Sequence, residues 1–245
     1  MATISKAYEK FEKTINRSTA LIRTHRTLLR TSINNRRIRA PKDLIRASVV
    51  LSVAALDAYI TDVFSEKLVP YLKKYSPDDL LVNILRDAGL DTYEALNLIK
   101  MDRPYRRVRT LVNAYYKKFT TQRFEVIDKL FLAFRLKDIS DRAQSKARRR
   151  TLKRSVAILI ERRHKIAHDG DYNSHGRLNK IDLNETKRRI DDIKLFVKCI
   201  DCVFRRIPPP KYDGKRHLNM IHSATRFRHI PPPEYDHSAT PLRAL

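Results

Sequence analysis

The sequence predicts an all-α protein, and three observations lead to that prediction. Apolar residues recur at steps of three or four along several long stretches, as they do on one face of an amphipathic helix. Residues that start and stop helices separate these stretches. The alternation with a period of two that marks a half-buried strand is not sustained anywhere in the 245 residues. With 42% hydrophobic residues, the chain can bury a substantial core.

Two long helices are expected first. Residues 4–33 have an apolar stripe opposite a face that is nearly all charged. Pro41 suits the first position of a second helix over 42–69, because its missing N–H is not needed there. Within it, residues 47–56 are apolar or small on every side, which predicts the central helix of a bundle, with Asp57 just past its most buried part.

Shorter helices are expected in the middle of the chain. Helix-start residues at 76–79 and Gly89 delimit a first one. Longer ones follow at 106–119 and 121–136. The whole region 76–136 is interpreted as either a helical insertion or a second layer of the bundle.

Two further core helices are expected before the chain changes character. After a polar break at 138–141, six cations fall among the nine residues 146–154, and the apolar segment 156–160 follows. Such a charge run is usually a solvated helix face, but here it leads directly toward Arg163. The last helix is expected over 184–205, with an apolar stripe at helical spacing.

A proline- and histidine-rich tail follows the helical region. The segment IPPPKYD at 207–213 returns as IPPPEYD at 230–236. We therefore divide the chain into a helical domain, 1–207, and a Pro/His-rich, extended tail, 208–245, that is too poor in apolar periodicity to fold alone. Its histidines lack carboxylate or thiol partners at ligand spacing, so no metal site is expected there.

The charge balance indicates a polyanionic partner. The chain has 52 Lys and Arg against 27 Asp and Glu, a formal net charge of +25. Nucleic acid is the first candidate and an anionic membrane surface the second. No run of about 18 apolar residues is present, and the first ten residues lack the order of a signal peptide. We expect a cytoplasmic protein with no membrane association.

Cofactor motifs are missing from the sequence. Cys199 and Cys202 have C-x-x-C spacing, but they lie in a helical pattern with no second pair for zinc and no preceding strand. They are interpreted as helix residues. With only four glycines, the chain contains neither a P-loop nor a dinucleotide-binding motif. No cofactor and no metal are therefore expected.

The segment from Arg163 to His168, just before Gly170, is the candidate catalytic site. Imidazole exchanges protons near neutral pH, and an arginine offers phosphate a planar fork of donors. A purely structural role, as the cationic end of a helix that Gly170 terminates, also accounts for these residues. On an ideal helix Arg163 and His168 lie about 140° apart, whereas His164 and His168 share a face.

Two segments resemble a known family. The run from Arg163 to His168 is similar to the Arg-x4–6-His motif of the HEPN superfamily of ribonucleases. The helix over 48–60, with Ala-Leu-Asp-Ala-Tyr at 55–59, resembles the early core helix of the RiboL-PSP branch of HEPN domains. The resemblance covers the helix after Pro41 and residues 152–204. It accounts neither for helices between 76 and 136 nor for the tail.

The resemblance implies a function and a set of roles. It implies a HEPN-like helical bundle that forms a homodimer, with Arg163 and His168 of both copies in one composite cleft. The expected activity is metal-independent endoribonuclease cleavage, in which the RNA 2′-hydroxyl attacks the adjacent phosphate and leaves 2′,3′-cyclic phosphate and 5′-hydroxyl ends. His164 stands where the family more often has Asn or Asp, so its role is less defined. Such domains serve as toxins or antiviral-defence effectors, with an antitoxin or defence-system protein as a possible partner.

The basic residues near the motif are the candidate contacts to RNA phosphates. They are Arg162, which also offers an alternative register for the motif's arginine, and Lys146, Arg148, Arg149, Arg150, Lys153 and Arg154. Two alternatives stay open. In the first, the chain is a non-catalytic HEPN-like module that binds RNA or a protein. In the second, it is a structural subunit whose positive charge docks an acidic protein.

Overall fold

A computed structural model describes residues 5–34, 41–116 and 123–205. Within these ranges it has nine helices and no strand, which confirms the predicted all-α class. The helices are α1 (Lys6–Asn34), α2 (Asp43–Lys74), α3 (Asp79–Asp87), α4 (Thr92–Ile99), α5 (Pro104–Tyr116), α6 (Phe124–Leu132), α7 (Ile139–Lys146), α8 (Leu152–Asp169) and α9 (Leu183–Arg205). The predicted tail, 208–245, lies outside the described residues, so its separation from the helical domain stays a prediction.

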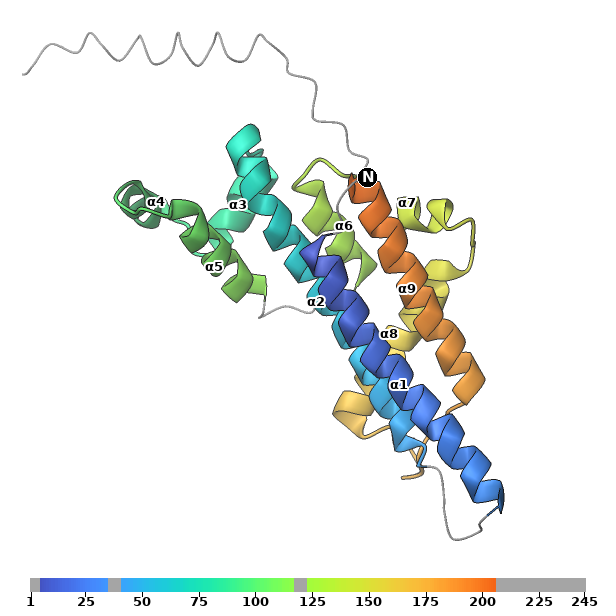
Figure 1. Cartoon of the computed structure of the whole chain (residues 1–245). Coiled ribbons are helices and arrows are strands. Elements are labelled where there is room, and N and C mark those ends of the chain that lie inside the picture. The colour runs from blue at the N-terminus through green and yellow to red at the C-terminus, as the bar shows by residue number, and fades with distance from the viewer. Residues whose placement is uncertain (1–4, 35–40, 117–122, 206–245) are drawn as a thin grey trace, which may run out of the picture. The chain divides into compact units, whose positions relative to one another are not determined.

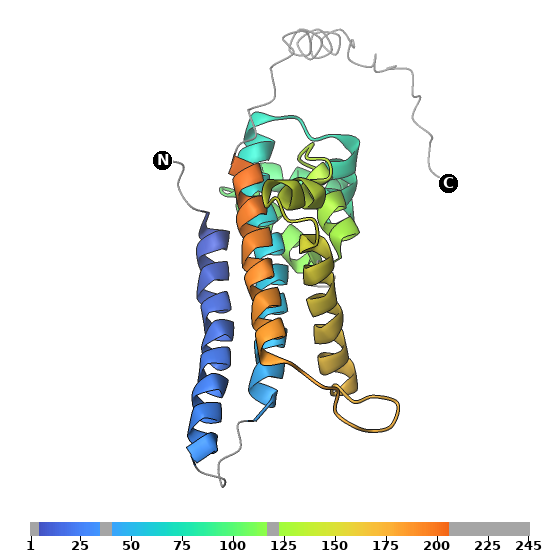
Figure 2. The same cartoon turned by 90° about the vertical axis from the view of Figure 1, so that its right-hand side faces the viewer.

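Four long helices, α1, α2, α8 and α9, form the bundle (Figures 1 and 2). The central one is α2, which packs against α1, α8 and α9 and also touches α5 and α6. Val49, Val53, Leu56 and Ile60 are fully buried along it. Burying each such side chain contributes about 1.5–3 kcal/mol, so the predicted central helix is also a main source of the core's stability.

The apolar character of α2 is explained by its place in the core. By length and composition alone it could cross a membrane, although no run of apolar residues long enough for this was expected from the sequence. Just over half of the apolar window, 56%, is buried inside the protein. The helix also continues through Pro70 to Lys74, beyond its expected end at residue 69.

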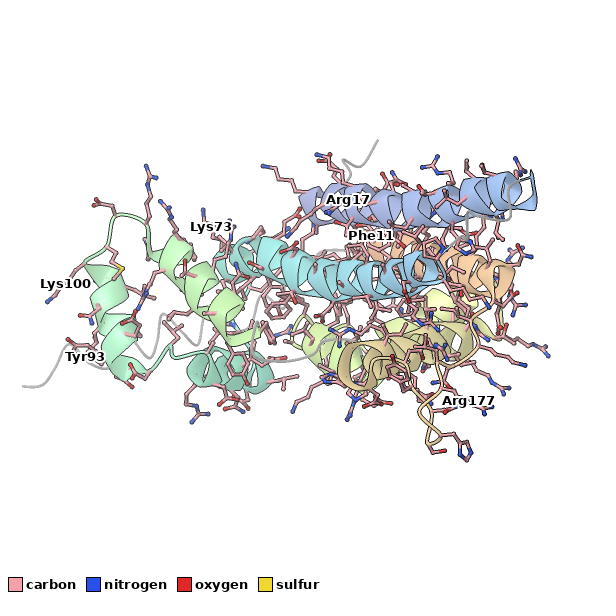
Figure 3. The ribbon with its side chains drawn as sticks, turned by 90° about the horizontal axis from the view of Figure 1, so that it is seen from below. Phe11, Arg17, Lys73, Tyr93, Lys100 and Arg177 are labelled. Carbon is pink, nitrogen blue, oxygen red and sulfur yellow. The ribbon has the colours of Figure 1, made fainter. Side chains whose placement is uncertain are left out.

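The middle of the chain divides into two parts. One is an arm of α3, α4 and α5, in which α5 packs on α2 and supports α3 and α4 (Figure 1). No residue of α4 is buried. The other part is α6, which contributes the buried Ile127 and Phe131 to the core and packs on α7. Figure 3 shows the arm, marked by Tyr93 and Lys100, far from the loop that carries Arg177.

Two boundaries in the second half of the chain also differ from the sequence prediction. The helix expected to reach residue 136 ends at Leu132, because Arg135 has a left-handed backbone (φ 62°) and the Leu136 N–H bonds back to the Phe131 carbonyl. The break expected at 138–141 is instead the start of α7, whose Ile139 is fully buried. Short helices of this kind depend on tertiary packing for their stability, so local sequence patterns predict them poorly.

Candidate functional site

The last turn of α8 ends at a sharply defined point. Gly170 has a left-handed backbone (φ 60°), and its N–H bonds to the carbonyl of Lys165. A Cβ at this position would lie 3.2 Å from two ring carbons of Tyr172. The helix therefore stops where the sequence predicts, but it remains helical through His168 and Asp169.

A buried carboxylate holds the loop that follows. Asp171 is fully buried, and its Oδ2 accepts hydrogen bonds from Arg46 Nε and Arg162 Nη2, each at 2.7 Å. Asn179 Nδ2 donates to the main-chain oxygen of Asp171 at 3.0 Å. Arg46 Nη2 donates to the Asn179 carbonyl at 2.8 Å. These contacts tie the 170–180 loop to the start of α2 and to α8.

Sequence reasoning missed three residues of this network: Arg46, Asp171 and Asn179. Two signals were present in the sequence. Arg46 sits beside Ile45 and Ser48 at the start of the most apolar helix, where a lone cation needs a partner. Asp171 directly follows the glycine that ends α8, and Asp is among the few residues that tolerate a left-handed backbone, here with φ 65°.

This hydrogen-bond network includes one of two neighbouring arginines and not the other. Arg162 is held by Asp171 and also donates to the carbonyl of Lys180 at 3.1 Å, so its guanidinium is part of the internal structure rather than of an open RNA-binding surface. Arg163 forms no ion pair with any described residue, and its buried Nε has no hydrogen-bond partner there. Of the two possible registers, Arg163 is the arginine whose donors remain available to a ligand.

The two histidines lie together on the exposed surface of α8. Their ring centroids are 4.3 Å apart, which confirms that His164 and His168 share a face. Because α8 is helical through both residues, Arg163 and His168 project about 140° apart. One copy of this helix does not direct the two side chains at the same atom.

The predicted basic run, 146–154, is not uniform. Lys146, Arg148 and Arg150 form no ion pair with the part of the chain that is described, and all three are exposed. Lys153 instead pairs with Asp141 at 2.7 Å and lies 5.3 Å from the centre of the Phe124 ring. Arg149 forms an ion pair with Asp192, which is fully buried on α9.

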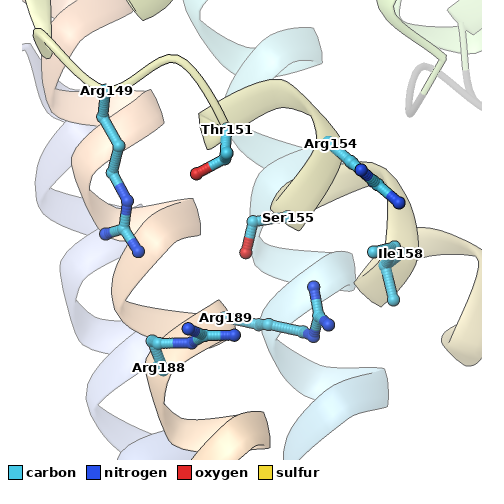
Figure 4. A pocket seen from close by; sticks show the side chains of 7 residues that line it. All are labelled: Arg149, Thr151, Arg154, Ser155, Ile158, Arg188 and Arg189. Atoms are coloured by element: carbon cyan, nitrogen blue, oxygen red, sulfur yellow. The ribbon is translucent and has the colours of Figure 1, made fainter.

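A cavity of about 280 Å³ opens between the start of α8 and α9 (Figure 4). It is lined by Arg149, Thr151, Arg154, Ser155, Ile158, Arg188 and Arg189. Arg188 and Arg189 were not among the sequence candidates. The signal for them was an Arg-Arg pair on the helix predicted to pack beside the basic run.

The remaining polar groups do not form a metal site within the described ranges, where no cluster of three or more His, Cys, Asp or Glu side chains is found. Cys199 and Cys202 are free thiols on α9. Cys199 is buried, and burial raises the pKa of its thiol. A buried thiol that resists ionisation fits the interpretation of this pair as helix residues.

Comparison with known proteins identifies the domain. The family model described as RiboL-PSP-HEPN matches residues 9–205, from the first turn of α1 to the end of α9. The match thus runs through α1 and the middle helices, which the resemblance seen in the sequence does not cover. No curated protein and no solved structure matches the chain. On the strength of the family match over most of its length, the chain belongs to the RiboL-PSP-HEPN family.

Proposed function

We propose that this protein is a metal-independent endoribonuclease whose active site is formed by Arg163 and His168. HEPN domains are often ribonucleases, and the family match supplies that starting point. The observation that carries the proposal is the contrast between two adjacent arginines. Arg162 is held by Asp171, whereas Arg163 has no ion-pair partner among the described residues and lies within about one turn of two exposed histidines.

The reaction follows from these groups. One imidazole accepts the proton of the ribose 2′-hydroxyl as its oxygen bonds to the adjacent phosphorus. The bond from phosphorus to the 5′-oxygen breaks, and that oxygen takes a proton from a second imidazolium. The products are a 2′,3′-cyclic phosphate and a 5′-hydroxyl. Arg163 donates to the phosphoryl oxygens as negative charge develops on them.

The divergence of Arg163 and His168 on α8 supports an active site shared by two copies of the chain. Arg163 and His168 diverge on one helix, and the reaction uses both a base and an acid. When two α8 ends face each other across a two-fold axis, Arg163 of one copy can meet His168 of the other. The symmetric pair also supplies the second imidazole. A homodimer with a composite cleft is therefore part of the proposal.

His164 is assigned a positioning role. Its ring contacts the His168 ring at a centroid distance of 4.3 Å, which restricts the rotamers of His168. Contacts to RNA phosphates are assigned to Lys146, Arg148 and Arg150, which have no ion pair among the described residues, and to the cavity arginines. Arg162 is left out because its guanidinium is held by Asp171.

The biological setting is proposed from the family alone. Such domains act in the cytoplasm as toxins or as effectors of antiviral defence. An antitoxin or a defence-system protein is then the expected partner. The formal charge of +25 supports RNA as the substrate class, since it favours association with any polyanion.

The test is cleavage of RNA in the presence of EDTA. We expect the wild-type chain to cut single-stranded RNA, to leave cyclic phosphate ends, and to bind but not cut DNA of the same sequence, which lacks the 2′-hydroxyl. His168→Ala should lower the rate by about 10²–10⁴-fold. His175→Ala, in the exposed loop after α8, is the matched control and should cut normally. Absence of cleavage by the wild type, or equal cleavage by His168→Ala, would contradict the proposal.

A non-catalytic RNA-binding module is the second candidate. The cavity between α8 and α9 favours it, because four arginines there can hold phosphate without any chemistry. Salt-dependent RNA binding by a folded wild-type chain that never cuts RNA would select this alternative.

A further inference from the structure

The cavity between α8 and α9 gathers more positive charge than its own carboxylates balance. Its walls contain four arginines: Arg149 from the loop before α8, Arg154 from the first turn, and Arg188 and Arg189 from α9. Two of them are paired, Arg149 with Asp192 and Arg189 with Glu185. Arg154 and Arg188 form no ion pair with any residue that the structure describes. Two guanidinium charges are therefore left without a neighbouring counter-charge.

The cavity is an organised site rather than a loose group of side chains. Asp192 is fully buried; Ser155 Oγ donates to its Oδ2 at 2.5 Å, and Arg149 pairs with its Oδ1. This carboxylate therefore fixes Arg149 at the wall of the cavity. Figure 4 shows Arg149 and Arg154 on opposite sides of the cavity, Arg188 and Arg189 along its lower edge, and Thr151 at its upper edge. The Thr151 side chain caps no backbone N–H, so its hydroxyl can donate to a ligand.

The chemistry of the walls selects phosphate. Guanidinium groups bind phosphate oxygens with two parallel hydrogen bonds. The first turn of α8 adds the partial positive charge of a helix N-terminus. A volume of about 280 Å³ is enough for a phosphate with part of its sugar, and Ile158, which is 38% exposed, offers the sugar an apolar surface.

The position of the cavity relates it to the proposed active site. Arg154 and His168 are 14 residues apart on the same helix, which places them about 21 Å apart along its axis and within about 40° of the same face. Between them, that face carries Ile158 and the Glu161–Lys165 ion pair. One RNA strand lying along α8 can therefore reach both places.

We propose that this cavity binds a backbone phosphate of the RNA several nucleotides away from the bond that is cut. The role as a substrate subsite rests on the proposed ribonuclease function. The binding of an RNA phosphate in the cavity does not depend on that function, because binding requires no cleavage. Long RNAs should gain affinity from the cavity, whereas a dinucleotide bound at the far end of α8 should not reach it.

The test compares two substitutions at the unpaired arginines with a matched control elsewhere. Arg154→Gln and Arg188→Gln, combined, remove two charges without leaving a carboxylate unpaired, so the fold is preserved. Arg17→Gln, at an exposed position of α1 that Figure 3 marks, combined with the equally exposed Arg23→Gln, removes the same charge. Binding is measured with a 2′-O-methyl RNA of about a dozen nucleotides, which lacks the attacking hydroxyl.

We expect the cavity variant to bind the 2′-O-methyl RNA about tenfold to a hundredfold more weakly, because it can no longer form charged hydrogen bonds to a phosphate. The slope of log affinity against log salt should become shallower by about 0.7 for each phosphate that the protein no longer neutralises. In the control variant, the affinity and the salt slope should change only as much as the loss of two positive charges from the whole protein explains. A dinucleotide, which is too short to reach the cavity, is the comparison substrate for all three proteins.

Three results would overturn the inference. The cavity variant and the control could bind the long RNA equally. The cavity variant could lose dinucleotide cleavage as well, which would mean a general structural effect. Inorganic phosphate or a mononucleotide could bind the wild type and not the cavity variant while RNA binding stays equal, which would make a free phosphate the ligand. If the wild type binds RNA through the cavity but never cuts it, the proposed ribonuclease function is refuted and the phosphate-binding cavity is not.

Discussion

The two ends of α8 use their arginines in opposite ways. At its start, four arginines from α8, α9 and the preceding loop converge on one cavity, so the site is complete within a single chain. At its end, Asp171 holds Arg162 inside, and Arg163 projects away from His168. A site that binds phosphate needs converging cations, which one chain can provide. A site that moves protons across a phosphate needs groups on two sides of it, and in the proposed ribonuclease one chain would provide only half of them.

The largest expected effect concerns the buried carboxylate at the end of α8. Asp171→Ala should lower the free energy of unfolding by about 3–5 kcal/mol, because it leaves Arg162 without its counter-charge and the buried Arg46 with only the exposed Asp43. Chemical denaturation measures this change. Asp169→Ala, two residues earlier and exposed, is the control and should cost little. A destabilisation below about 1 kcal/mol for Asp171→Ala would mean that the network does not define this end of the helix.

The next effect tests whether the end of α8 is half of a site. Arg163→Ala should reduce cleavage by about 10²–10³-fold, the usual cost of removing one group that stabilises developing charge. His168→Ala should also cut RNA slowly, because it lacks the imidazole that transfers the proton. When the two variant chains are mixed and allowed to exchange, one copy brings His168 and the other brings Arg163. The mixture should then cut RNA faster than either variant alone but more slowly than the wild type, because each mixed pair has only one His168.

The mixing experiment has a clear opposite outcome. If Arg163 and His168 act within one chain, no chain in the mixture has both residues and the rate should stay at the level of the single variants. Wild type mixed with a double variant of Arg163 and His168 serves as the control for exchange between chains. A rate that stays at the level of the single variants would refute the contrast between the two ends of α8, because the catalytic site would then also be complete in one chain.

The smallest expected effect concerns the dependence of folding stability on pH. His25 on α1 is 3% exposed, neither of its ring nitrogens has a hydrogen-bond partner in the described parts, and its pKa is lowered by burial and then by nearby Lys42. The unfolded chain therefore binds this proton more readily than the folded one. The contribution of His25 to stability is complete above its unfolded pKa of about 6.5 and is lost as the pH falls below it.

Denaturation of the wild type and of His25→Leu between pH 5 and 8 measures this dependence. We expect the wild type to lose stability on acidification in that window, and His25→Leu to lose less. A variant with the same pH dependence as the wild type would assign the effect to other groups. Any change in cleavage rate that persists in His25→Leu then belongs to the exposed end of α8.

Features set by local sequence were predicted well. The all-α class, the central place of α2 and the stop at Gly170 each follow from a pattern within one helix or one turn. The shared face of His164 and His168 follows from the period of the helix alone. Helix α7 was missed because its eight residues have little amphipathic pattern of their own, and packing of Ile139 and Ala143 forms it.

The sequence by itself determined that this is a basic helical protein with an arginine and two histidines at the end of a core helix. Only the tertiary structure decided which arginine is available there, because Asp171 folds back to meet Arg46, 125 positions away in the chain. It also brought Arg188 and Arg189 beside the basic run before α8. The physical reason is the same in both cases. A charge is free or bound according to what packs against it, and packing partners distant in sequence leave no local pattern.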